Sequence, residues 1–191
     1  MSYLLNALGL LIDLAFNAIV TLLLLRVMAE ACRADFLNPL SQFIYRYTNP
    51  ALAPVRRVLP NWRRINLAAL VLAWLAMLLK RVVIFALMGV APGLAGLLVL
   101  AAAELLDFAL MICLVMVFAW SLLSMFAVDP RHPVQRLLDA VVAPLMRPLR
   151  GRMVVGMMDF SPMVVMIALL LARMLVAAPL LDWGMRLALA G

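Results

Sequence analysis

Four charged residues stand within long apolar stretches of this sequence, where they are candidates for chemistry inside a membrane. They are Asp13, Lys80, Asp107 and Arg173. An ionisable group in hydrocarbon is costly, so such groups usually pair with one another or line a water-filled cavity. Pairing predicts structural salt bridges, or side chains that reach the headgroups from the helix ends. A cavity predicts a path for a cation or a proton. Helix geometry places Asp13 at the depth of Lys80, and Asp107 at the depth of Arg173.

A second set of candidates belongs to a segment rich in proline and arginine that occurs twice. An offset of 94 residues relates the copies, which hold Pro39, Pro50, Pro54, Arg56 and Arg57 in the first and Pro133, Pro144, Pro148 and Arg150 in the second. Three interpretations of the arginines stay open: they set topology, they bind anionic lipid phosphates, or they dock a cytoplasmic protein partner. The repeated prolines indicate a fixed backbone shape, which topology alone does not require.

Signals for an enzyme are weak. His132 is the one histidine of the chain, and a lone histidine does not make a zinc site. The sequence has no HExxH or CxxC motif, no serine in a GxSxG context and no glycine-rich phosphate loop. We therefore expect a non-enzymatic protein without a metal or another cofactor.

Composition indicates that a bilayer surrounds the elements that position these residues. Of 191 residues, 69% are hydrophobic and 13% are charged, whereas a soluble domain has about half and about a quarter. The net charge is +7, but the basic residues stand beside apolar runs. Their placement favours anionic lipid headgroups, rather than nucleic acid, as the partner.

Apolar runs predict four membrane helices, over residues 4–34, 65–88, 97–128 and 159–179, with a short tail after Pro179. In the first proline–arginine segment we expect a short amphipathic helix that ends at Pro50, because a residue before proline leaves the α region. Its apolar face, by helical spacing, is Leu40, Phe43, Ile44 and Tyr47. The second copy repeats this face at Val134, Leu137, Leu138 and Val141.

The duplication extends beyond the segment. The offset of 94 also matches Asp13 to Asp107 and Asp35 to Asp129, and an offset of 93 matches Asn66 to Asp159 and Lys80 to Arg173. Each unit therefore has two spans, and both units enter the membrane in the same orientation, as parallel repeats. The predicted fold is an all-α integral membrane protein of two helical hairpins, each with a proline-kinked amphipathic element. Residues 1–92 and 93–191 are the predicted repeats of one membrane domain.

Orientation follows from the distribution of basic residues. Most arginines lie in the two proline–arginine segments, whereas the opposite face has at most Lys80, Arg81 and Arg186. The positive-inside rule then places both segments in the cytoplasm and both termini outside it.

The run from Asn38–Pro39 through Pro50 to Pro54–Val55–Arg56–Arg57, with the helix start Asp159–Phe160–Ser161–Pro162, resembles the paired repeats of the YggT family. The resemblance covers nearly the whole chain. It departs from the family pattern at Gly151–Arg152–Met153 and at Asn66–Leu67–Ala68. It implies a multi-pass protein of the bacterial inner membrane or of plastid membranes, linked to osmotic shock tolerance, cation uptake or assembly. Architecture follows from it more readily than mechanism.

Two functions stay open. The first is a membrane scaffold, or an assembly and partner-docking protein of the envelope, that acts in osmotic tolerance. The second is a small cation channel or transporter component with Asp13 and Asp107 on its path, which would require a homo-oligomer because four spans leave little room for a pore. A single wet cavity shared by Asp13, Asn17, Thr21 and Asp107 would favour transport, and dry packing of the hairpins would favour scaffolding.

Overall fold

The computed structural model describes residues 2–59, 64–126, 129, 131–149, 154–155 and 158–190. Within these ranges the chain is almost wholly helical. The helices are α1 (Ser2–Ala31), α2 (Pro39–Arg56), α3 (Leu67–Leu87), α4 (Leu94–Met125), α5 (Pro133–Met146), α6 (Ser161–Ala172), the π-helical η1 (Arg173–Ala177) and α7 (Ala178–Leu189). The two-residue strands β1 (Val154–Val155) and β2 (Met158–Asp159) pair antiparallel.

Four helical segments are long and apolar enough to cross a membrane. They are Tyr3–Ala31, Leu67–Leu87, Leu94–Met125 and Ser161–Leu189. The last combines α6, η1 and α7, which follow one another without a break. The predicted all-α membrane fold with four spans is therefore confirmed.

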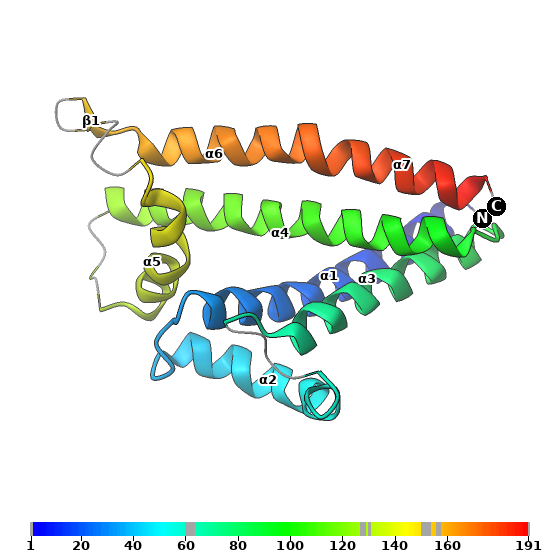
Figure 1. Ribbon diagram of the computed structural model, residues 1–191, viewed down its shortest axis with the longest axis horizontal. Helices are drawn as coiled ribbons and strands as arrows, with labels where there is room; N and C mark the ends of the chain where they lie inside the picture. Colours follow the sequence, from blue (N-terminus) through cyan, green and yellow to red (C-terminus); the bar gives the residue numbers. More distant parts are fainter. Residues whose placement is uncertain are drawn as a thin grey trace.

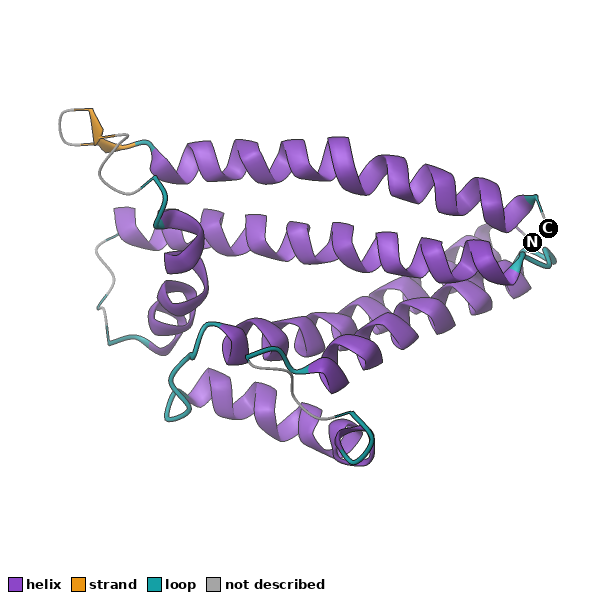
Figure 2. Ribbon diagram, viewed as in Figure 1, coloured by secondary structure: helices purple, strands orange, loops and turns teal. Residues whose placement is uncertain are grey.

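The spans form two hairpins with the same orientation (Figures 1 and 2). Both termini lie at one end of the molecule, called here the terminus end, and α1 and α4 both run away from it. The short helices α2 and α5 lie at the opposite end, called here the motif end. Helix α4 contacts α3 of the first hairpin as well as α6, η1 and α7 of its own. The hairpins are thus parallel repeats, as predicted, joined through α3 and α4.

The two short helices begin in the same way. Asn38 caps α2, where its Oδ1 accepts a hydrogen bond at 2.9 Å from the backbone N–H two residues later. His132 caps α5 through Nδ1 at 3.3 Å in the corresponding geometry. Pro39 and Pro133 fill the first turns, where no N–H is needed. Asn38 also donates from Nδ2 to the carbonyl of Pro133 at 2.7 Å, so the two copies meet directly.

Helix α2 does not end at Pro50, which corrects the sequence prediction. It continues to Arg56, with Pro50 and Pro54 inside it. A proline frees the carbonyl four residues earlier, and those carbonyls belong here to Arg46 and Pro50, which are both exposed. Water or lipid headgroups can satisfy them, so the helix tolerates both rings. In Figure 1 the first turns of α2 run across the view and its last turns are almost end-on, so the helix bends.

The buried face of α2 is also rotated from the predicted one. Phe43 and Tyr47 are 50% and 60% exposed, with ring centroids 4.5 Å apart. Polar groups share the buried face, which consists of Ser41, Ile44, Thr48 and Leu52. Helical spacing could not choose between the faces, because lipid accepts apolar side chains as readily as a protein core does. In α5 the prediction was closer, since Leu137, Leu138 and Val141 are buried and Val134 is exposed.

The fourth span continues through Pro179 instead of ending there. In η1 the N–H of Ala178 donates to the carbonyl of Arg173, five residues earlier. This wider turn changes the carbonyl pairing just before the proline ring, whose missing N–H would otherwise interrupt an α-helix. The predicted tail is therefore helical to Leu189.

Close packing of α4 against α7 depends on two glycines. A Cβ added to Gly96 would overlap the backbone of Ala188, and one added to Gly184 would lie 2.8 Å from the backbone nitrogen of Leu100. The N–H of Gly93 donates to the carbonyl of Ala188 at 2.8 Å. Small residues let membrane helices approach this closely, and dispersion then holds them together.

Candidate functional site

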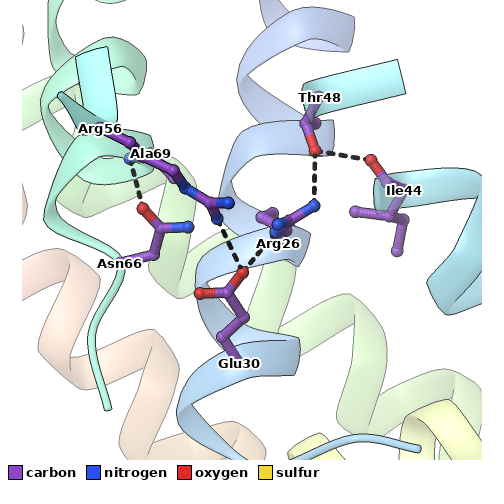
Figure 3. Close-up of polar contacts among 7 residues, drawn as sticks. All are labelled: Arg26, Glu30, Ile44, Thr48, Arg56, Asn66 and Ala69. Atoms are coloured by element: carbon purple, nitrogen blue, oxygen red, sulfur yellow. Dashed lines mark hydrogen bonds and ion pairs between the residues drawn. The ribbon is translucent and has the colours of Figure 1, made fainter. Parts of the chain in front are cut away.

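The first group of charged residues lies at the motif end and is centred on Arg26, in the last turns of α1. Arg26 is 2% exposed. Its Nε lies 2.5 Å from Glu30 Oε1, and its Nη1 donates to Thr48 Oγ1 at 3.2 Å. The Thr48 hydroxyl donates in turn to the carbonyl of Ile44 at 2.6 Å (Figure 3). A buried guanidinium thus joins α1 to α2.

The ring of Tyr45 packs against the Arg26 guanidinium. The Cζ of Arg26 lies 3.5 Å from the centroid of the Tyr45 ring, in a cation–π contact. Tyr45 Oη is buried and has no hydrogen-bond partner within the described part of the chain. Burial raises the pKa of Tyr45, and the nearby Glu30 carboxylate raises it further. The phenol is therefore neutral, with a proton free to donate.

Arg56, in the last turn of α2, reaches the same carboxylate. Its Nη2 lies 3.2 Å from Glu30 Oε1, the oxygen that Arg26 also contacts. Figure 3 shows the two guanidinium groups converging on Glu30 from α1 and α2. Arg56 Nε is buried and lacks a hydrogen-bond partner among the residues described. One carboxylate thus serves two arginines, and positive charge is left in excess.

These groups line an open pocket of about 770 Å³, called here the arginine pocket. It brings together four arginines and one glutamate. Its lining residues are Arg26, Glu30, Arg33, Phe36, Tyr45, Asn49, Arg56 and Arg64. Its volume is within the range typical of small-molecule sites. The chemistry of this lining suits an anion.

Arg33 enters the pocket from a strained backbone position. Its φ is 55°, the left-handed conformation in which a helix usually ends on glycine. The following N–H, of Ala34, donates to the carbonyl of Ala29 at 2.8 Å and closes the end of α1. A side chain with a Cβ costs about 1 kcal/mol in this conformation. Glycine would fit the turn better, so the arginine is not required by the fold.

The predicted contact residues of the proline–arginine segments are distributed unevenly. Arg56 lies in the arginine pocket, whereas Arg57 is exposed beside it. Arg150 lies outside the described residues. The prolines at element starts and within helices are Pro39, Pro50 and Pro54 of α2 and Pro133 and Pro144 of α5, and Pro148 follows α5. Of these, all but Pro133 are exposed.

The second group of charged residues lies within the spans, around Lys80 of α3. Lys80 is 2% exposed and pairs with Glu104 of α4. Its Nζ also lies 3.5 Å from Asp13 Oδ1 and donates to Asn17 Oδ1 at 3.1 Å. Arg81 Nε binds the other oxygen of Glu104 at 2.7 Å. Glu104 therefore ties the second hairpin to the first.

Asp107 and Arg173 form the corresponding pair of the second repeat. Arg173 donates from Nε and Nη2 to the two carboxylate oxygens of Asp107, at 2.7 and 2.9 Å. Its Nη1 contacts Met111 Sδ at 3.1 Å. The arginine stands at the first residue of η1. Four predicted intramembrane charges thus lie as two repeat-related ion pairs, and Glu104 is added to the first.

The two repeats differ where the first span meets its short helix. Trp120 and Asp139 stand 94 residues after Arg26 and Tyr45, and Trp120 Nε1 donates to Asp139 Oδ1 at 2.5 Å. The same contact between elements is therefore made by a cation–π pair in one copy and by a hydrogen bond in the other. The arginine pocket belongs to the first repeat.

Arg26, Glu30 and Tyr45 were not among the candidate site residues predicted from the sequence. The missed signal was the pairing of a polar row, Ser41 and Thr48, with an intramembrane arginine. Polar residues within a membrane protein face each other where they can, so this row marked the buried side of α2.

Comparison with known sequences places the chain in a family. The sequence model of the CCB3/YggT family matches residues 5–87 and 99–180, one segment in each hairpin. The chain is 31% identical to the uncharacterized protein YggT of Escherichia coli K12, over 94% of each chain. It is 36% identical to an uncharacterized protein of Pseudomonas aeruginosa, over 81% of this chain and 80% of that one. A Haemophilus influenzae relative is 33% identical over 81% of each. No solved structure matches the chain. The two matched segments start 94 residues apart and cover both hairpins, and the chain therefore belongs to the CCB3/YggT family.

Proposed function

We propose that the protein is a non-enzymatic scaffold of the bacterial inner membrane, which docks a partner protein at its motif end. The observation that carries this proposal is the pairing of the intramembrane charges. Lys80 is held by Asp13, Asn17 and Glu104. Arg173 is held by both oxygens of Asp107. Charges that are paired within the protein satisfy one another and leave fewer open ligands for a conducted ion.

The cavities support the same conclusion. Asp13 and Asn17 line a pocket of about 490 Å³ between α1 and the end of α3. Asp107 is engaged with η1 and does not line it. The pocket of about 390 Å³ bordered by α1, α3 and α4 has only apolar and aromatic side chains in its lining, including Trp74. Asp13 and Asn17 therefore share one pocket, whereas Asp107, the other carboxylate predicted for an ion path, lies elsewhere.

A docking surface for the partner is available on α2. Phe43 and Tyr47 are exposed, with their rings in tilted contact, and Arg46 lies between them in sequence and is also exposed. Aromatic and arginine side chains dominate the energetic centres of protein interfaces. By the positive-inside rule this surface is cytoplasmic and the termini are periplasmic.

Photocrosslinking in cells tests the docking role. A crosslinking amino acid at Phe43 or Tyr47 is expected to give a discrete protein adduct. The same residue at Leu8, which is exposed on the outer half of α1, is the lipid-facing control. Adducts at the α2 positions that match those of Leu8 would remove the docking role. A strain lacking the protein should also lose survival of osmotic shock, and Phe43→Ala with Tyr47→Ala should fail to restore it.

The alternative is a small cation channel, which Asp13 favours because its side chain is half exposed in the pocket at the terminus end. Potassium flux from liposomes that hold the pure protein separates the two functions. A scaffold gives the flux of protein-free liposomes in the wild type, in Asp13→Asn and in Asp107→Asn. Wild-type flux that either variant reduces would establish the channel and overturn the scaffold.

A further inference from the structure

We infer that the arginine pocket is a binding site for a phosphate group, of the kind carried by an anionic lipid headgroup. This site is independent of the scaffold role, because it requires no protein partner. The first observation is its charge. Arg26, Arg33, Arg56 and Arg64 line one pocket with Glu30 as the one carboxylate of that lining. Guanidinium groups are the side chains best suited to phosphate oxygens, which they bind with paired N–H donors.

The second observation is a pair of unused donors in the same pocket. Arg56 Nε and Tyr45 Oη are both buried, and neither has a hydrogen-bond partner within the described ranges. A buried donor without an acceptor costs free energy. The residues that carry these donors, Arg56 and Tyr45, both line the pocket, and a small rotation of each side chain would let one anion there accept from both. An apolar or cationic ligand would leave both costs in place.

The third observation is that the site is held in shape before any ligand arrives. Arg26 is fixed by Glu30, by Thr48 and by the face of the Tyr45 ring. Arg56 is fixed by the same Glu30 oxygen. Glu30 thus positions two guanidinium groups without neutralising both. A preorganised site binds more tightly, because little side-chain freedom remains to be lost.

The position of the pocket identifies the source of the phosphate. Arg26 lies five residues before the end of α1, about 7 Å along the helix axis from the end of the span. The span has 29 residues and is about 44 Å long, close to the thickness of a bilayer with its headgroups, so a span centred in the membrane would hold Arg26 near the boundary between hydrocarbon and headgroups. The lipid is therefore expected to bind with its phosphate among the arginines.

Calorimetric titration of the pure full-length protein in a neutral detergent tests the site. The ligands are a short-chain phosphatidylglycerol, the matching phosphatidylcholine and inorganic phosphate. We expect saturable binding of phosphatidylglycerol that weakens by about tenfold in Arg33→Gly and in Arg64→Gln, since each removes one charged donor set. Arg57→Gln is the matched control, because Arg57 is exposed and outside the pocket lining. Its affinity should stay within about twofold of wild type.

Arg33→Gly separates binding from folding. Glycine relieves the left-handed backbone strain at φ 55°, so this variant should be no less stable than wild type while it binds less. Phosphatidylglycerol binding without phosphate binding assigns the site to a lipid headgroup. Equal arginine-dependent binding of inorganic phosphate assigns it to a soluble phosphate. Absence of saturable binding, or equal loss in Arg57→Gln and Arg33→Gly, would overturn the inference.

Discussion

Replacing Asp107 should destabilise the protein more than replacing its repeat equivalent Asp13. In Asp107→Asn the Arg173 guanidinium loses the charge of the carboxylate that holds it through two hydrogen bonds, and its other polar side-chain contact among the described residues is Met111 Sδ. A hydrogen bond to a charged group contributes about 1.5–3 kcal/mol. Because the pair is a quarter exposed, we expect a loss of about 2 kcal/mol in the free energy of unfolding.

In Asp13→Asn the Lys80 ammonium keeps Glu104 and Asn17. The lost partner is at 3.5 Å and is half exposed, so the expected loss is about 0.5 kcal/mol. Reversible unfolding of both variants in mixed micelles with increasing sodium dodecyl sulfate measures the difference. Equal losses, or a larger loss for Asp13→Asn, would show that Glu104 does not hold Lys80 in the way described here. The double variant Asp107→Leu with Arg173→Leu should regain most of the stability lost in Asp107→Asn, because no unpaired charge is left in the membrane.

Three further results follow from the structure. Gly184→Val should separate α7 from α4 and lower the free energy of unfolding by more than about 2 kcal/mol, whereas Gly9→Ala, with open space around its Cβ position, should be neutral or stabilising; micelle unfolding measures both. Burial raises the pKa of the Cys32 thiol, so at about pH 8 its alkylation should be slower than that of an unburied thiol, and the rate should rise with pH beyond the ordinary thiol range. In intact cells an impermeant maleimide should label Tyr3→Cys but reach Leu37→Cys only after permeabilisation, since positive-inside orientation places these exposed positions on opposite sides; the reverse pattern would invert the topology.

The four spans and their arrangement in two hairpins could be predicted from the sequence, because the patterns that indicate them extend over many residues. Apolar runs of twenty or more residues define spans with little dependence on context. The offset of 94 residues showed a repeated unit of two spans, and such a repeat predicts two parallel hairpins. Pro39 and Pro133 begin α2 and α5, where a first-turn proline follows from local geometry alone.

Predictions from local sequence were wrong or missing where contacts between elements determine the structure. Pro50 and Pro179 were read as helix ends, yet exposed carbonyls at one and a π turn at the other let the helices continue. The buried face of α2 depends on which side packs against the rest of the protein. Helical spacing alone could not show that Phe43 and Tyr47 lie on the other side. The arginine pocket is formed by α1, α2 and the segments that follow each of them, including Arg64 before α3, so spacing within any one element could not reveal it.

Glu104 has a consequence for how a duplicated chain diverges. It occupies the position of Leu10 in the first copy, and it pairs with both Lys80 and Arg81 across the repeats. The first copy in return keeps Arg26 and Tyr45, where the second has Trp120 and Asp139. In a symmetric dimer of identical single hairpins, a glutamate such as Glu104 and a contact such as that of Arg26 with Tyr45 would each occur twice or not at all. In one polypeptide each feature occurs once, Glu104 in the second repeat and the arginine pocket in the first, so the two repeats are not equivalent and the molecule is asymmetric in the membrane plane.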